Sequence, residues 1–427
     1  MLKTFANAWR IEEIRKKILF TLFIVLLYRV GNAVPVPYVN VAFLQEYFQS
    51  LENTVLGLYN VMSGGAFSSA TIFALSIQPY INSSIIMQLL CVAIPALERM
   101  SKEQGEEGRK KIASITRYVT VLIALLQGFA YYVLIKNNGL LTADGSGIWA
   151  AIVIIMTFTA GSALIMWLGE QITEFGIGNG ISIILFASIV SRFPSSVIST
   201  ISGIGAGTIA WWAALLILVG AIALIVLIVF VHDAERRIPV QYSKRVVGRK
   251  MYGGQSTHLP MKVNMSGVMP VIFAQSIASL PATVAQLFGW TSNFWLYASR
   301  TNTWLYVIIY ALLIVFFGYF YSTIQFNPIE ISNNLRKNGG FIPGYRPGKP
   351  TTMFIQKVLN KVTLFGSLYL CIIAALPYIV SIYSNVATNM GIALGGTSII
   401  IVVGVALETV QALESQMLMR HYKGFLD

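Results

Sequence analysis

The residues that could carry enzymatic chemistry lack the spacing that common catalytic, nucleotide-binding and metal-binding motifs require. The segment from Gly344 to Pro350 is spaced wrongly for a phosphate-binding loop and ends in proline, where that loop needs serine or threonine. The segment from Gly176 to Gly180 follows an apolar run rather than a strand, so we interpret it as a tight turn between helices. The histidines and cysteines are scattered, without metal or disulfide spacing: His232, His258, His421, Cys91 and Cys371. These patterns predict no enzyme, no metal site and no cofactor.

Carboxylates within apolar runs would indicate ion-coupled transport, because such transporters place ionisable groups at mid-membrane. Glu170 and Glu174 stand at the inner end of the fourth apolar run, and Glu408 stands near the inner end of the tenth. This scarcity favours a passive conduit driven by an external motor. A secondary solute transporter is the alternative, and a membrane-embedded enzyme is a third hypothesis.

One apolar run, from Ala74 to Cys91, carries more polar side chains than a lipid-facing helix tolerates. They are Ser76, Gln78, Tyr80, Asn82, Ser83, Ser84 and Gln88. Polar groups without partners are costly in lipid, so one face of this helix should contact water or other helices. The preceding Gly/Ser-rich segment, Gly57 to Thr71, is too short to span the membrane. We interpret the two as a pore wall with a movable stopper; a kinked buried span after a structured external loop is the alternative.

The elements that must position these residues are membrane helices. Of 427 residues, 56% are hydrophobic and 11% are charged, whereas soluble proteins carry about a quarter charged residues. We therefore predict an all-α integral membrane protein, with residues 1–17 as an amphipathic helix on the membrane surface. Ten apolar runs are long enough to span a bilayer: 18–36, 74–94, 112–135, 149–169, 181–201, 210–231, 266–287, 304–324, 362–383 and 396–413.

Charge placement predicts the orientation of these ten spans. With the N-terminus in the cytoplasm, 26 of the 30 lysines and arginines lie on the cytoplasmic side. The other four are Arg29 in the first span, and Lys136, Arg192 and Arg300 at or beyond the outer ends of helices. Both termini are therefore expected in the cytoplasm. Ten spans divide near residue 205 into halves 1–205 and 206–427, and five spans per half would give an inverted repeat around a central pore.

Two predicted cytoplasmic loops, 232–265 and 325–361, are unusually long for connections between spans. Both are basic and contain tyrosines, which favours docking of an anionic or phosphate-bearing partner. The alternative is that their charges serve only as topology signals. We favour docking because of the loop length.

Four long segments carry a resemblance to a known family. They are SGGAFSSATIFALSIQPYINSSIIMQLL (63–90), GEQITEFGIGNGISIILFASIV (169–190), QSTHLPMKVNMSGVMPVIFA (255–274) and GGFIPGYRPGKPT (339–351). In this order they closely resemble the SecY family, the central channel subunits of the bacterial protein translocase. The resemblance implies a channel in the bacterial cell membrane that passes unfolded secretory chains outward and releases apolar segments laterally into lipid.

The resemblance also implies site residues. The family's aliphatic pore ring falls here on Ile77, Ile81, Leu185, Ile272 and Ile401. The plug falls on about 57–70, including Gly57, Ser63, Gly64, Gly65, Ala66 and Phe67. Polar residues of the lateral gate, where hydrogen bonds would hold the seam closed, are Asn82, Gln127 and Asn264. The alternative for the ring residues is ordinary packing between helices. The alternative for the gate residues is hydrogen bonding that joins helices without a role in gating.

The two basic loops match the surfaces that the family offers to a motor and to ribosomes. The residues expected to dock there are Arg236, Arg237, Lys244, Arg245, Arg249, Lys250, Arg336, Lys337, Arg346 and Lys349. The implied partners are small SecE-like and SecG-like membrane subunits, the SecA motor ATPase, the ribosome through its RNA, signal peptides with unfolded precursor chains, and membrane lipids.

Overall fold

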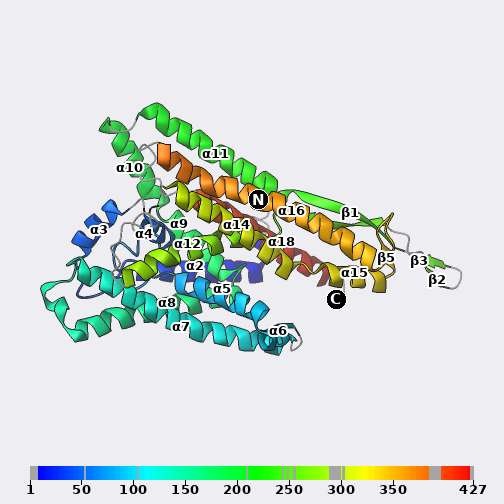
Figure 1. Cartoon of the computed structure of the whole chain (residues 1–427), viewed down its shortest axis with the longest axis horizontal. Helices are drawn as coiled ribbons and strands as arrows, with labels where there is room; N and C mark the ends of the chain where they lie inside the picture. Colours follow the sequence, from blue (N-terminus) through cyan, green and yellow to red (C-terminus); the bar gives the residue numbers. More distant parts are fainter. Residues whose placement is uncertain are drawn as a thin grey trace.

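A computed structural model describes residues 8–51, 54–102, 105–207, 210–242, 245–247, 250–252, 256–287, 300, 303–383 and 396–423. These residues form a helical bundle with a small sheet at one end (Figure 1). The short helices α3, α4 and α10 lie at the end of the bundle opposite the strands. The predicted all-α membrane architecture is confirmed for the bundle, and the strands belong to the segments predicted as cytoplasmic loops.

The helices of the first half of the chain include five predicted spans and several short elements. They are α2 (Glu12–Gly31), α3 (Val41–Ser50), α4 (Val55–Met62), α5 (Gln78–Ala93), α6 (Pro95–Lys102), α7 (Gly105–Asn137), the 3₁₀ turn η1 (Ala143–Ser146), α8 (Ile148–Phe175), α9 (Gly180–Val190) and α10 (Phe193–Gly205). The helices of the second half are α11 (Trp211–Asp233), α12 (Met269–Leu287), α14 (Trp304–Gln325), α15 (Pro328–Lys337), α16 (Lys349–Tyr383) and α18 (Gly396–Lys423).

Seven stretches of the described chain are long and apolar enough to cross a membrane: α7, α8, α9 with α10, α11, α14 with α15, α16 and α18. The other three predicted spans also form helices but fall short of these limits. Helix α2 carries cationic residues at both ends, α5 has 16 residues, and the apolar stretch Met269–Pro281 of α12 is too short. Such spans are possible in a membrane protein, because neighbouring helices can supply hydrogen-bond partners for backbone groups that a short or proline-containing helix leaves free.

Several predicted boundaries were wrong, each for a local reason. The second span begins at Gln78 rather than at residue 74, because Ser76 adopts a φ of 50° and Pro79 starts the helix. The ninth span begins at Lys349 rather than at residue 362, because charged residues outside a bilayer need not end a helix. Residues 12–17 continue the first span as part of α2, so this part of the predicted surface helix is not a separate element; residues 1–7 lie outside the described residues.

The two basic loops join in one antiparallel sheet, which the sequence did not predict. Strand β1 (Glu235–Tyr242) lies between β4 (Ser256–Lys262) and β5 (Gly340–Phe341), with Ile238 opposite Leu259 and Gln241 opposite Phe341. Strands β2 (Arg245–Val247) and β3 (Lys250–Tyr252) form a separate hairpin. An apolar core beneath the sheet comprises Ile238, Val240, Met261, Ile342, Ile355 and Leu359. The loops are therefore one folded module seated on the start of α16.

Two large apolar clusters form most of the core within the bundle, and a small one joins Ala8, Ile14, Ile177 and Leu413. Of the two large ones, the larger cluster draws on α2, α5, α8, α9, α12, α14, α16 and α18, and the smaller cluster joins α3, α7, α8 and the segment 66–75. Helix α12 packs against α5, α7 and α14, so it connects the early spans to the late ones. Helix α4 contributes Val55 and Met62 to the larger cluster and Leu56 to the smaller one, which places it between the two.

Candidate functional site

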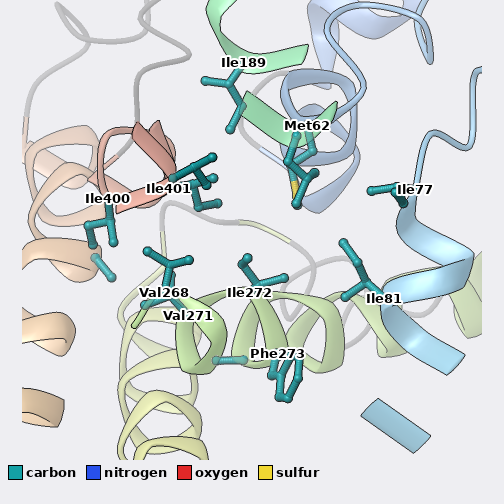
Figure 2. Packing of buried hydrophobic residues seen from close by; sticks show 14 of the residues in the cluster. Met62, Ile77, Ile81, Ile189, Val268, Val271, Ile272, Phe273, Ile400 and Ile401 are labelled. Atoms are coloured by element: carbon teal, nitrogen blue, oxygen red, sulfur yellow. The ribbon is translucent and has the colours of Figure 1, made fainter. Parts of the chain in front are cut away.

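The five aliphatic residues predicted to form a ring come together in the larger cluster. Each is buried, with an exposed fraction of at most 5%. They come from the start of α5 (Ile77 and Ile81), from α9 (Leu185), from α12 (Ile272) and from α18 (Ile401). In Figure 2, the labelled side chains of Ile81, Ile272 and Ile401 point toward the same space from three different helices. Large apolar side chains from four helices therefore meet inside the bundle.

The predicted plug segment is a short helix followed by tight turns. Helix α4 packs against α9 and α12, and Met62 at its end points toward the same space as Ile272 (Figure 2). The turns carry positive φ angles at Gly64 and Gly65. The Gly/Ser-rich sequence indicated a weakly held segment, but Gly57, Ser63, Ala66 and Phe67 are all buried.

Gly64 lies against the end of α9 so closely that no other residue fits without a shift. A Cβ there would lie 2.8 Å from the Ser188 carbonyl oxygen and 2.9 Å from Ser191 Oγ. The φ of 69° adds a second restriction, because L residues rarely adopt it. Ser191 Oγ also accepts a hydrogen bond of 3.1 Å from Arg29. The one arginine inside the first span therefore braces the helix end on which the plug segment rests.

Phe67 anchors the far end of the plug segment. Its ring stacks on Tyr131 of α7 with centroids 4.3 Å apart, and the Tyr131 hydroxyl donates a hydrogen bond to the Phe67 carbonyl oxygen. Ala70 bonds through its carbonyl oxygen to the Val36 amide at 2.9 Å. The segment thus divides into α4, which lies over the ring, and residues 66–71, which are tied into the smaller cluster. Sequence reasoning missed this anchor, because Tyr131 is one of two adjacent tyrosines in an ordinary apolar run.

The three predicted gate residues are not joined by hydrogen bonds in the described structure. Within it, Asn82 Nδ2, Gln127 Oε1 and Asn264 Oδ1 have no hydrogen-bond partner. Asn264 lies before α12 and beside α16, where a Cβ added at Gly366 would be 3.7 Å from its Cα. The role of these three residues in holding the seam closed stays a prediction.

Contacts between α12 and the early spans come from other residues. Helix α12 packs directly on α5 and α7, and Tyr59 of α4 shares a hydrogen bond of 2.9 Å with Ser279 of α12. Ser83 of α5 and Thr120 of α7 share a bond of 2.5 Å, which couples those two helices. The seam between α5 with α7 and α12 is thus held mainly by packing.

Two ionisable sites of the spans lie close to neighbouring elements. Arg117 of α7 contacts Glu170 of α8 at 2.8 Å. Glu408 of α18 is partly buried beside Gly267, whose Cβ would lie 3.0 Å from its carboxylate oxygen. No group of three or more metal-ligating side chains occurs among the described residues.

Six of the basic residues predicted to dock a partner lie on or next to the module formed by β1, β4 and β5, which we name the cytoplasmic module after the predicted side of its loops. Arg236 and Arg237 are exposed on β1, and Arg336, Lys337, Arg346 and Lys349 are exposed around the end of α15 and the following turn. The turn is held by Ser332 Oγ, which donates to the Gly348 carbonyl oxygen at 3.2 Å, and by Thr351 Oγ1, which donates to that of Arg346 at 2.8 Å. Arg245 and Lys250 lie on β2 and β3, while Lys244 and Arg249 lie outside the described residues.

Long apolar helices packed around an aliphatic cluster have the architecture of an integral membrane protein. The SecY family model matches residues 71–410. The protein translocase subunit SecY of Streptomyces scabiei is 43% identical over the full length of both chains. That of Thermotoga maritima is 44% identical over 100% of this chain and 98% of the relative. The chain belongs to the SecY family of protein-conducting channels.

Solved structures with similar folds agree. One described as "The structure of a protein conducting channel" matches with a TM-score of 0.67 over 95% of this chain and 93% of that chain, at 17% identity. A second concerns the plug domain of SecY (TM-score 0.65, 17% identity, 95% and 92% covered), and a third concerns Sec61 in a canine ribosome-channel complex (TM-score 0.63, 16% identity, 95% and 93% covered). These likenesses show that the chain has the fold of these channels.

Proposed function

We propose that the aliphatic ring is the constriction of the channel and that α4 with residues 63–65 is its plug. Large apolar side chains exclude water by dewetting and can still yield around a passing chain. The observation that carries this proposal is the convergence of four helices on one aliphatic cluster with Met62 of α4 beside it. The structural neighbour whose description assigns the SecY plug domain a role in the closed state and membrane seal supports it.

The proposed lateral gate is the seam between α5 with α7 and α12 with α14. A nascent apolar segment would pass through this seam into lipid when the halves 1–205 and 206–427 move apart. Packing of α12 on α5 and α7 supports the proposal, since separating packed faces needs no covalent or ionic bond to break. Gln127 and Asn82 would meet an entering chain there with unpaired amide groups.

The proposed partner surface is the cytoplasmic module. Exposed guanidinium groups on a Pro/Gly-constrained turn suit carboxylates on a motor protein such as SecA or phosphates of ribosomal RNA. A ribosome is bound in one structural neighbour, which supports the second partner. Helix α11, which is exposed along almost its whole length, offers a face for lipid or for small SecE-like and SecG-like subunits. The bacterial relatives support a location in the bacterial cell membrane.

A disulfide across the seam separates this channel from a solute transporter, which needs no seam wide enough for a polypeptide. Cys91 and Cys371 are first replaced by serine, and cysteine is placed at Asn82 and along Ile272–Leu280 of α12 until a pair oxidises efficiently. A disulfide requires Cα atoms within about 7 Å, so it would hold the seam shut.

The locked protein should stay folded but stop passing precursor, and reduction should restore passage. A pair placed within α12 and α14, on one side of the seam, is the matched control and should leave transport intact. If every pair that crosslinks efficiently across the seam still transports precursor normally, the seam is static packing and the lateral-gate proposal is wrong.

A further inference from the structure

Two glutamines flank α4 directly beside the aliphatic ring. Gln78 follows Ile77 at the start of α5, and Gln275 lies three residues after Ile272 on α12, close to the same helix face. Both side chains are buried, at 3% and 4% exposure. Two neighbouring amides at the narrowest part of a channel are unexpected in an otherwise apolar cluster.

Both amides lack the hydrogen bonds that buried polar groups normally make. Within the described structure, Gln78 Oε1 and Gln275 Oε1 have no partner. Gln78 Nε2 donates to the thioether sulfur of Met62 at 3.0 Å, which is a weak acceptor. Such unsatisfied groups are rare in native proteins and are costly, so each needs a reason to be there.

A small cavity of about 10 Å³ lies between these amides and α4. Its lining consists of Val55, Leu58, Tyr59, Met62, Gln78, Gln275 and Ser279. Four of these residues belong to α4, so moving α4 away would open the cavity and expose both amides to the pore. The hydrogen bond between Tyr59 and Ser279 opposes this movement of α4, because it joins α4 to α12.

We propose that Gln78 and Gln275 form a binding layer for the peptide main chain of the translocated polypeptide, which α4 covers in the closed channel. The proposal rests on the assignment of α4 as the plug. An extended polypeptide presents an unpaired N–H group at every residue except proline, and these groups are the same in every substrate. Amide oxygens therefore suit a site that must accept any sequence. The same oxygens disfavour the closed state, in which they have no partner, and so favour release of α4.

The test uses a cysteine reporter on the plug of the full-length protein in vesicles. Cys91 and Cys371 are replaced by serine, and Ser63→Cys places a thiol where the exposed fraction is 2%. The variant Q78M/Q275M keeps side-chain length but removes both acceptors, and each single change is made as well in case the pair fails to fold. Q88M on α5 is the matched control, since Gln88 Oε1 also lacks a partner within the described structure but lies outside the cavity. S279A removes the bond from Tyr59.

Two rates are measured: reaction of the thiol introduced at position 63 with a membrane-impermeant thiol reagent at rest, and backsliding of a precursor arrested in the channel after ATP is removed. Q78M/Q275M should slow the labelling about fivefold or more and speed the backsliding by a similar factor, whereas Q88M should match the parent. S279A should speed the labelling about threefold. A variant pair that matches the parent in either rate overturns the proposal. Labelling of the reporter thiol in the parent is also measured with precursor in the channel. If precursor does not increase this labelling, the plug assignment itself is wrong.

Discussion

At the scale of single residues, the ring shows what sequence spacing can and cannot predict. Ile81 lies in the first turn of α5 and Ile77 is its N-cap residue, so a spacing of four residues brings them close together. Nothing in the local pattern relates them to Leu185, Ile272 or Ile401, because aliphatic residues at helical spacing are the rule in any membrane bundle. Their convergence was expected only from the family resemblance, and the structure places all five in one cluster.

A polar substitution in the ring should open a resting leak. Ile272→Ser shortens the side chain and adds a hydroxyl at the constriction, which should allow water to enter and raise the resting ion conductance several-fold. Single-channel recording in planar bilayers measures this. Ile165→Ser, at a fully buried position of α8 in the same cluster, is the control and should leave conductance unchanged. Equal conductance in the ring variant and the parent would contradict the assignment.

Arg346 is the residue through which the cytoplasmic module is expected to act on a motor. It is exposed on a turn bounded by Gly344 and Gly348, whose positive φ angles are 86° and 108°. Arg346→Glu should reduce ATP-driven translocation at least tenfold while melting temperature stays within a few degrees, because reversal of an exposed charge seldom affects folding. Lys357→Glu, exposed on the following helix, should transport normally. If the Arg346 variant transports precursor as well as the parent, the basic charges of this turn serve only as a topology signal.

At the scale of elements, the predicted plug segment is the part of the chain for which the structure adds most to the sequence. Its composition predicted a loose stopper over 57–70, but residues 66–71 belong to the smaller cluster through Phe67 and Ala70. Only α4 and residues 63–65 lie on the ring side of this anchor. The distinction depends on stacking between Phe67 and Tyr131, which are 64 residues apart. Contacts over that distance are invisible to local composition.

Deletion of residues 57–65 should leave a folded channel that leaks small ions at rest, since the anchor at Phe67 is retained. The longer deletion of 57–70 should also lower thermal stability, because it removes the buried Phe67 ring, a loss that costs about 3–5 kcal/mol in protein cores. Conductance and melting temperature measured on both deletions check this. A short deletion that is as tight as the parent would show that α4 does not seal the pore.

The cytoplasmic module shows a second limit of local patterns. Strand β1 contains Ile238, Val240 and Tyr242, which are residue types common in strands. Its partner β4 carries Pro260, which argues against a strand, and β5 has two residues. Pairing of β1 with β5 joins positions about a hundred residues apart, so it depends on how α14, α15 and α16 return the chain to the same end of the bundle.

At the scale of the whole molecule, hydropathy predicted most of the helices, whereas the orientation derived from charge stays a prediction. Each of the ten predicted spans contains a helix, because a bilayer imposes both length and internal hydrogen bonding. Composition could not predict where helices continue beyond the bilayer, as α7 and α16 do, since the membrane no longer sets their ends. The division into halves 1–205 and 206–427 remains a prediction. It bears on the proposed lateral gate, because α12 of the second half packs there against α5 and α7 of the first half.

Movement of a secretory precursor through the protein tests the central claim most directly. Purified channel in lipid vesicles, supplied with its small membrane subunits, SecA, ATP and a radiolabelled precursor, should render the precursor resistant to external protease until detergent is added. Omission of ATP is the control and should leave the precursor accessible. If protected precursor does not accumulate although every component is intact, the chain does not conduct polypeptides under motor drive, and solute transport becomes the better account.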